Sequence, residues 1–223
     1  YILQATAVYG DKLFFVSEEV TVGSSGIANL ALTLLPSIEL TGSVRLKSSS
    51  GQRARVRLDL DPASGSVEWN EAGDSFIISS VLQRKYRLGI IPLKDDGDGT
   101  VDFYVKSVRM GNQDIQRKEF SVVGGAAPID IVLADDTGTL AGTVTDAGGN
   151  PVSSRVWVSQ QGVLVLGFSS DNEGRIRPIK VPPGEYVVYA ADAMQRDPPE
   201  GASDVEVPPS GSVNVSLKRV ERQ

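Results

Sequence analysis

The sequence predicts an all-β fold made of tandem two-sheet sandwiches, and two features of the chain carry this prediction. The first is an alternation of apolar and polar residues in short runs such as Val56–Leu60 and Val213–Leu217, the period of a half-buried strand. The second is turn chemistry between the runs, as in DAGGNP at Asp146–Pro151 and PPGE at Pro182–Glu185. No stretch carries a sustained helical period with caps, so the sequence favours strands throughout.

Length and charge set the next limits. The chain has 223 residues, 40% hydrophobic and 22% charged, which is an ordinary globular balance. This length accommodates modules of about 100 residues, a common domain size. The formal net charge is −6 and the sequence shows no basic stripe, so nucleic acid is not expected as a partner.

The chain contains neither cysteine nor histidine. It therefore lacks a thiolate nucleophile, a Cys/His zinc site and a histidine general base. The sequence predicts a non-catalytic protein without a cofactor. The absence of cysteine fits both a cytosolic and an exported bacterial protein. No apolar run approaches the ~20 residues that span a bilayer, and the chain starts at Tyr1 without a methionine, so further sequence is expected upstream.

The sequence repeats itself with a period near 100 residues. ELTGSV at Glu39–Val44 matches TLAGTV at Thr139–Val144, an offset of 100 residues. Further apolar positions align at the same offset without a gap: Val56 with Val156, Leu58 with Val158, Phe76 with Ile176, Val81 with Val181, Tyr86 with Tyr186 and Leu88 with Val188. The repeat predicts a duplicated domain, with one sandwich at 38–136 and another at 137–223.

Residues 1–37 resemble the second half of a further copy. YILQATAVYG after Tyr1 matches the segments that follow Tyr86 and Tyr186, and Leu32 with Leu34 matches the apolar pair of the last strand. The middle copy has a longer interval after its tyrosine, which indicates an insertion near 92–116. A half-sandwich exposes unpaired edges. Two alternatives stay open: upstream residues complete it, or strands of another molecule do so.

The third copy contains LAGTVTDAGGNPVSSRVWVSQQ and SSDNEGRIRPIKVPPGEYVVYAADA. This pattern resembles the carboxypeptidase regulatory-like domain, an Ig-like, transthyretin-like (prealbumin-like) Greek-key sandwich, from about Leu140 to Leu217. It departs from the family at Arg155 and Ile176, and in the middle copy SVLQRKYRL replaces the PPG turn. The run from YVKSVRMGNQDI to IDIVLADDTGTLAGTVTD resembles repeats of large exported proteins of Acidobacteria-type organisms. The resemblance implies structural, adhesive or accessory modules and supplies no catalytic residues.

Trp157 and Tyr189 are the candidate residues for a partner or ligand surface. If Val156 and Val158 face the core, Trp157 points outward. An exposed tryptophan stacks on sugar rings or anchors a protein partner. Tyr189 is the second aromatic candidate for the same role.

Three carboxylates in DDGDG (Asp95, Asp96 and Asp98) raise the alternative of a calcium loop. The EF-hand pattern is not met, because Lys106 stands at the twelfth loop position from Asp95. The other interpretation is a solvated hairpin tip, and no metal is predicted. Lys47 with Asp130, from the first and last strands of the middle copy, is a weaker candidate pair for an isopeptide crosslink like those of some bacterial adhesins.

Together these features predict a non-catalytic structural or adhesive repeat region of a larger exported bacterial protein. It would be a cell-surface or filament component that binds protein partners, or itself, by strand pairing at sandwich edges. The alternative is a carbohydrate-binding or accessory module of a secreted hydrolase or outer-membrane receptor, with a glycan as ligand. The predicted location is extracellular or at the cell surface, with the periplasm as the alternative.

Overall fold

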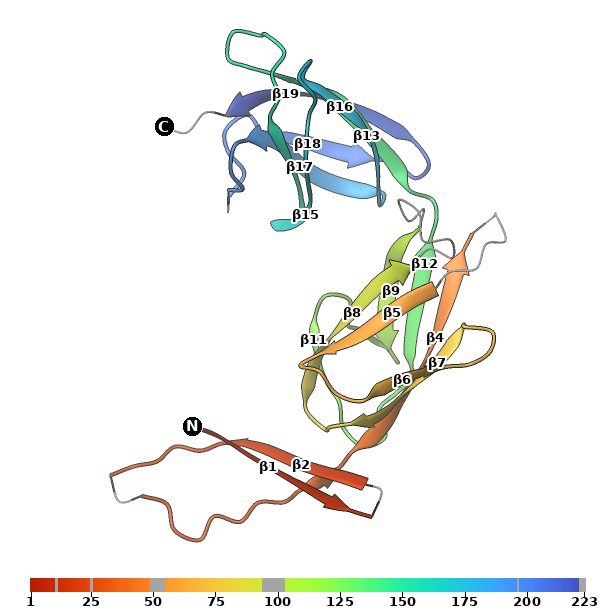
Figure 1. The fold of residues 1–223 in the computed structure, drawn as a ribbon, viewed down its shortest axis with the longest axis vertical. Coiled ribbons are helices and arrows are strands. Elements are labelled where there is room, and N and C mark those ends of the chain that lie inside the picture. Colours follow the sequence, from red (N-terminus) through yellow and green to blue (C-terminus); the bar gives the residue numbers. More distant parts are fainter. Residues whose placement is uncertain (11, 25, 49–54, 94–102, 196, 221–223) are drawn as a thin grey trace. The chain divides into compact units, whose positions relative to one another are not determined.

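The computed structural model describes residues 1–10, 12–24, 26–48, 55–93, 103–195 and 197–220. Within these residues every regular element is a strand, which confirms the predicted all-β sandwich class (Figure 1). The chain divides into two compact units, Tyr1–Ala134 and Asp135–Gln223. A helix long and apolar enough to cross a bilayer is not found in the described part of the chain.

The first unit begins with a small antiparallel sheet of its own, drawn in red in Figure 1. Its order is β1 (Ile2–Tyr9), β2 (Lys12–Glu19) and β3 (Leu35–Pro36). Leu32 and Leu34, which match the apolar pair of the last strands in the sequence, do not lie in a strand. Last strands elsewhere in the chain are held by parallel pairing with a first strand, and the described residues offer this segment no such partner.

The rest of the first unit is a two-sheet sandwich, which we call the middle sandwich. One sheet has the order β10-β9-β12-β4-β7-β6 and the other has the order β11-β8-β5. The strands are β4 (Ile38–Lys47), β5 (Arg55–Asp61), β6 (Ser66–Trp69), β7 (Ser75–Val81), β8 (Lys85–Leu93), β9 (Tyr104–Met110), β10 (Gln113–Asp114), β11 (Glu119–Ser121) and β12 (Ile129–Ala134). β9 and β10 fall in the segment where the sequence indicates an insertion, and β9 extends the larger sheet beyond β12.

The second unit is the C-terminal sandwich, drawn from green to blue in Figure 1. β16-β13-β19 form one side and β15-β14-β17, with β18 beside β17, form the other. Pairing at Ala190–Arg219 and Ala191–Val220 joins the two sides through β17 and β19. The strands are β13 (Gly138–Thr145), β14 (Arg155–Gln160), β15 (Val163–Ser169), β16 (Arg175–Val181), β17 (Gly184–Ala191), β18 (Ser203–Val207) and β19 (Ser212–Val220).

Apolar residues that align in the sequence face the core in both sandwiches. Two separate core clusters form, one in each sandwich. The buried pairs at the offset of 100 residues are Leu40 with Leu140, Val44 with Val144, Val56 with Val156, Leu58 with Val158, Phe76 with Ile176, Val81 with Val181 and Tyr86 with Tyr186. Alternate residues of these strands therefore point inward, as the period-two pattern requires.

The first and last strands of each sandwich pair in parallel around a glycine. In the middle sandwich Gly42 lies opposite Phe76 on β7 and Ile129 on β12. In the C-terminal sandwich Gly142 lies opposite Ile176 and Val215 in the same way. A Cβ on Gly142 would overlap the carbonyl oxygen of Val215, so the close approach of the two strands requires glycine.

A tyrosine hydroxyl fixes the same turn in both sandwiches. Tyr86 Oη donates to the carbonyl oxygen of Leu82 at 2.9 Å, and Tyr186 Oη donates to that of Pro182 at 2.7 Å. Each tyrosine ring is buried. The turn before Tyr86 therefore keeps the hydrogen bond made by the PPG turn, although its sequence is different.

The altered turn of the middle sandwich contacts the first sheet. Gln83 Nε2 donates to the carbonyl oxygen of Pro36 at 2.9 Å, while its Oε1 accepts from the Gly124 amide at 2.8 Å. The Arg84 guanidinium lies 5.5 Å from the Phe15 ring centre and 5.3 Å from that of Tyr86. The hydrogen bond to Pro36 and the cation–π contact with Phe15 link β3 and β2 to the middle sandwich.

We expect Gly142→Ala to lower the free energy of unfolding of the C-terminal sandwich by about 1–3 kcal/mol, because the new methyl group overpacks the β13–β19 contact. Chemical denaturation followed by circular dichroism measures the change. Thr143→Ala, on the exposed side of the same strand, is the control, with an expected change below about 1 kcal/mol. Equal losses for both variants would contradict this role for Gly142.

Candidate interaction surfaces

Trp157 lies on the outer face of the C-terminal sandwich, as its place between two buried valines predicts. Its side chain is half-buried, and its Nε1 donates to the carbonyl oxygen of Ala191 at 3.0 Å. The Arg155 guanidinium lies 5.5 Å from the ring centre, and a Cβ on Gly167 would meet the ring at 2.8 Å. Neighbours on β14, β15 and β17 therefore hold the indole in place.

Tyr189 is not an exposed aromatic, which corrects the expectation from the sequence. It lies opposite Trp157 in the β14–β17 register, but it is only 3% exposed. Its Oη donates to the Gln195 carbonyl oxygen at 3.2 Å and accepts from the Gln195 amide at 3.1 Å. The loop after β17 folds over this face, and the period of the strand carries no information about such a cover. The pair of exposed aromatics that a sugar platform needs is not formed by these two residues, and their role as a ligand surface stays a prediction.

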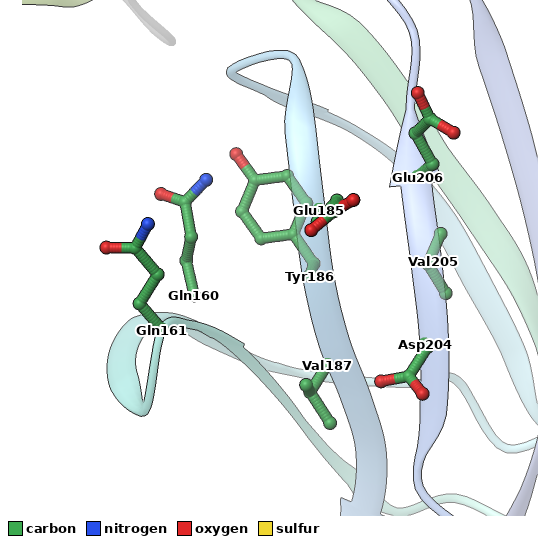
Figure 2. A pocket seen from close by; sticks show the side chains of 8 residues that line it. All are labelled: Gln160, Gln161, Glu185, Tyr186, Val187, Asp204, Val205 and Glu206. Atoms are coloured by element: carbon green, nitrogen blue, oxygen red, sulfur yellow. The ribbon is translucent and has the colours of Figure 1, made fainter.

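A shallow groove runs beside β17 and β18 in the C-terminal sandwich (Figure 2). Its volume is about 640 Å³, and its lining residues are Gln160, Gln161, Glu185, Tyr186, Val187, Asp204, Val205 and Glu206. Glu185 and Glu206 are opposite each other in the strand register. Like charges placed in this way disfavour the pairing unless a cation or solvent screens them. No group of three or more metal-ligating side chains in the described ranges is placed to hold an ion.

Two sequence-based alternatives concern other acidic residues. The calcium alternative at Asp95, Asp96 and Asp98 lies outside the described residues. The crosslink candidate Asp130 forms a two-point ion pair with Arg45 and accepts a hydrogen bond from Ser43 Oγ at 3.2 Å. Arg45, two residues before Lys47, takes the carboxylate because it lies closer in the β4–β12 register.

The β13 turn holds a carboxylate with a lowered pKa. Asp146 Oδ1 accepts from the Asn150 amide at 2.9 Å, and the Asn150 side chain also donates to the carboxylate. These hydrogen bonds favour the ionised form and hold the pKa of Asp146 below its ordinary value of 3.8. The carboxylate closes the DAGGNP turn, as expected of an Asx-type turn.

The two sandwiches differ in what covers one edge. β14 pairs with β15 along Arg155–Gln160, whereas β6 pairs with β7 instead of β5. Within the described residues, β5 therefore pairs only with β8. A groove of about 340 Å³ lies in this region, lined by Arg55, Val56, Trp69, Asn70, Glu71, Ala72, Gly73 and Leu93. Trp69 packs against Phe76 with ring centres 5.3 Å apart.

Exposed apolar side chains gather in residues 1–36. Nine of the sixteen exposed large hydrophobic residues in the described chain lie there: Tyr1, Ile2, Leu3, Val8, Tyr9, Val22, Ile27, Leu30 and Leu35. Val8 is 73% exposed and Tyr9 is 83% exposed. Large exposed apolar patches are found at protein–protein, membrane and ligand-binding sites and in aggregation-prone proteins, so residues 1–36 are a candidate interaction surface. The uncharged run ILQATAVY is the sequence signal for it.

Comparison with known proteins gives distant structural similarities. No family model matches the chain, and no curated protein matches it. The Bacillus anthracis TIE protein is similar with 14% identity and a TM-score of 0.32 over 97% of this chain, which spans 42% of that chain. A streptococcal ancillary pilin is similar with 11% identity and a TM-score of 0.33 over 95% of this chain and 73% of that chain.

A further similar structure is BcpA, the major pilin subunit of Bacillus cereus, with 10% identity and a TM-score of 0.33. The similarity covers 93% of this chain and 84% of that chain. The resemblance to the carboxypeptidase regulatory-like domain stays a prediction, since no family model matches.

Trp157→Phe is expected to lower the free energy of unfolding of the C-terminal sandwich, because the smaller ring buries less apolar area and the Ala191 carbonyl loses its donor. We expect the lost hydrogen bond to account for about 1–2 kcal/mol of the decrease. Denaturation of Trp69→Phe gives the control, since no hydrogen bond from the Trp69 indole is found in the described residues. Similar losses for the two variants would show that the indole hydrogen bond contributes nothing.

Asp146 should titrate below its ordinary pKa of 3.8, measured by the NMR shift of its carboxyl carbon. Because the folded-state pKa is lowered, the contribution of this carboxylate to stability is present above the unfolded pKa and is lost as pH falls through the folded pKa. Asn150→Ala removes the side-chain hydrogen bond and keeps the backbone one, so it should move the titration part of the way toward the ordinary value. An unchanged midpoint in this variant would show that the Asn150 side chain does not contribute to the lowered pKa.

Proposed function

We propose that this chain is a non-catalytic structural or adhesive region of an exported bacterial surface protein, and that it associates with protein partners through exposed strand edges. The observation that carries this proposal is the concentration of exposed apolar side chains in residues 1–36. Soluble chains rarely leave such residues uncovered unless another molecule or segment binds there.

The distribution of buried residues supports the same function. The apolar faces of the sandwich strands are buried in two cores. Strand edges, turns and the first sheet are therefore the surfaces available for binding. Edges recognise other chains through backbone hydrogen bonds, a mode that needs no specialised side-chain chemistry. The outer edge of β5 and the free edge of β1 are of this kind within the described residues.

We further propose that the sandwiches at 38–136 and 137–223 are copies of one module and that residues 1–37 are half of another. The matching registers of Gly42 and Gly142, and the matching hydroxyl contacts of Tyr86 and Tyr186, support this duplication. Repeated modules of this type suit a cell-surface or filament component. The extracellular location rests on the resemblance of the third copy to domains of exported proteins.

Light scattering over a concentration series tests the proposed association. We expect the average mass of the purified 223-residue chain to rise between about 1 μM and about 1 mM, the range of weak and transient complexes. Replacing the exposed Ile2, Val8 and Tyr9 by threonine should suppress the rise, while Val163→Thr on β15 should not. A constant monomer mass across the series would overturn assembly through exposed edges.

A further inference from the structure

β1 is an edge strand of its sheet, and within the described part of the chain no strand pairs with its outer side. Tyr1 and Val20 exchange two hydrogen bonds, of 3.0 Å from the Tyr1 nitrogen and 2.8 Å from the Val20 nitrogen. Hydrogen-bonded pairs alternate in an antiparallel ladder, so the odd-numbered residues of β1 bond to β2. The N–H and C=O groups of Ile2, Gln4, Thr6 and Val8 therefore point to the free edge.

This edge lacks the features that protect edge strands from pairing. Proteins protect such edges with charged residues, proline, bulges or short strands. β1 has eight residues, and its ladder with β2 runs from Ile2 to Tyr9 without a register shift. Its sequence, ILQATAVY, has no charge, no proline and no glycine. By contrast, the edge strand β16 carries Pro178 between Arg177 and Lys180.

The edge is also complementary to itself. Two copies of β1 related by a two-fold axis perpendicular to the sheet keep the same side chains on the same face. With the axis at Ala5, Ile2 lies opposite Val8 of the second copy and Gln4 lies opposite Thr6. Apolar residues then face apolar residues and polar residues face polar ones, with no charge on either strand.

The same register satisfies the backbone. The outward groups of Ile2 and Gln4 meet those of Val8 and Thr6, and about eight hydrogen bonds form across the interface. An axis at Thr6 instead would place Gln4 opposite Val8 and leave Ile2 without a partner strand. The register centred at Ala5 is therefore the better match in both hydrogen bonds and side chains.

We propose that β1 pairs in antiparallel orientation with β1 of a second copy of this chain, around a two-fold axis at Ala5. The pairing joins two first sheets into one continuous sheet. This inference rests on the proposed function, since it names the partner and the edge through which association takes place.

Disulfide trapping tests the register, because the chain has no cysteine of its own. In Ala5→Cys the two thiols belong to a non-hydrogen-bonded pair with Cα atoms about 4.5 Å apart, which a disulfide can bridge. Mild oxidation with oxidised glutathione should convert most of this variant to a covalent dimer. In the matched control Ala7→Cys, on the same face of β1, the Cα atoms are about 14 Å apart and crosslinking should be at least about tenfold slower.

Val8→Lys gives a second measurement, because it places a charge opposite Ile2 of the other copy. We expect it to weaken association at least about tenfold in light scattering, while Val163→Lys, an exposed valine on the β15 edge, leaves association unchanged.

Equal crosslinking of the two cysteine variants in a chain that still associates would overturn β1 pairing and leave the proposed function standing. A chain that stays monomeric would overturn both, and would leave the β1 edge to a strand from elsewhere, such as upstream sequence.

Discussion

Parallel pairing of the first and last strands closes both sandwiches, and the other features of the fold depend on it. At Gly42 and Gly142 the two strands approach so closely that no side chain fits between them. This contact aligns residues that lie 87 positions apart in the middle sandwich (Gly42 and Ile129) and 73 positions apart in the C-terminal sandwich (Gly142 and Val215). It also sets which face of each strand is buried. Leu32 and Leu34, for which the described residues provide no parallel partner strand, do not lie in a strand.

The same constraint explains how far the sequence determines the structure. Alternation of apolar residues predicts a strand and its inward face, and the buried positions of Val56, Leu58 and Tyr86 follow from it. It does not predict which neighbour covers an edge. β6 and β15 occupy similar places in the chain, yet β6 pairs with β7 and β15 pairs with β14, because the choice depends on loop lengths and packing.

The candidate site was less predictable than the fold. The outward direction of Trp157 follows from its neighbours, but its hydrogen bond to Ala191 and the cover over Tyr189 come from residues far away in the chain. The free edge of β1 has a local signal, the absence of charge and proline. Its meaning becomes clear only when the register with β2 shows which backbone groups point outward. An uncharged strand inside a sheet and one at its edge have the same sequence pattern.

The tyrosine hydroxyl contacts have a consequence for how such modules diversify. Because Tyr86 and Tyr186 each donate to a backbone carbonyl four residues earlier, the residues between these two points are free to differ, as QRK at Gln83–Lys85 and PGE at Pro183–Glu185 do. In the middle sandwich two of these residues, Gln83 and Arg84, contact Pro36 and Phe15 of the preceding sheet. The turn is thus a natural position for grafting new contact residues, and engineered loops inserted there would inherit a rigid support.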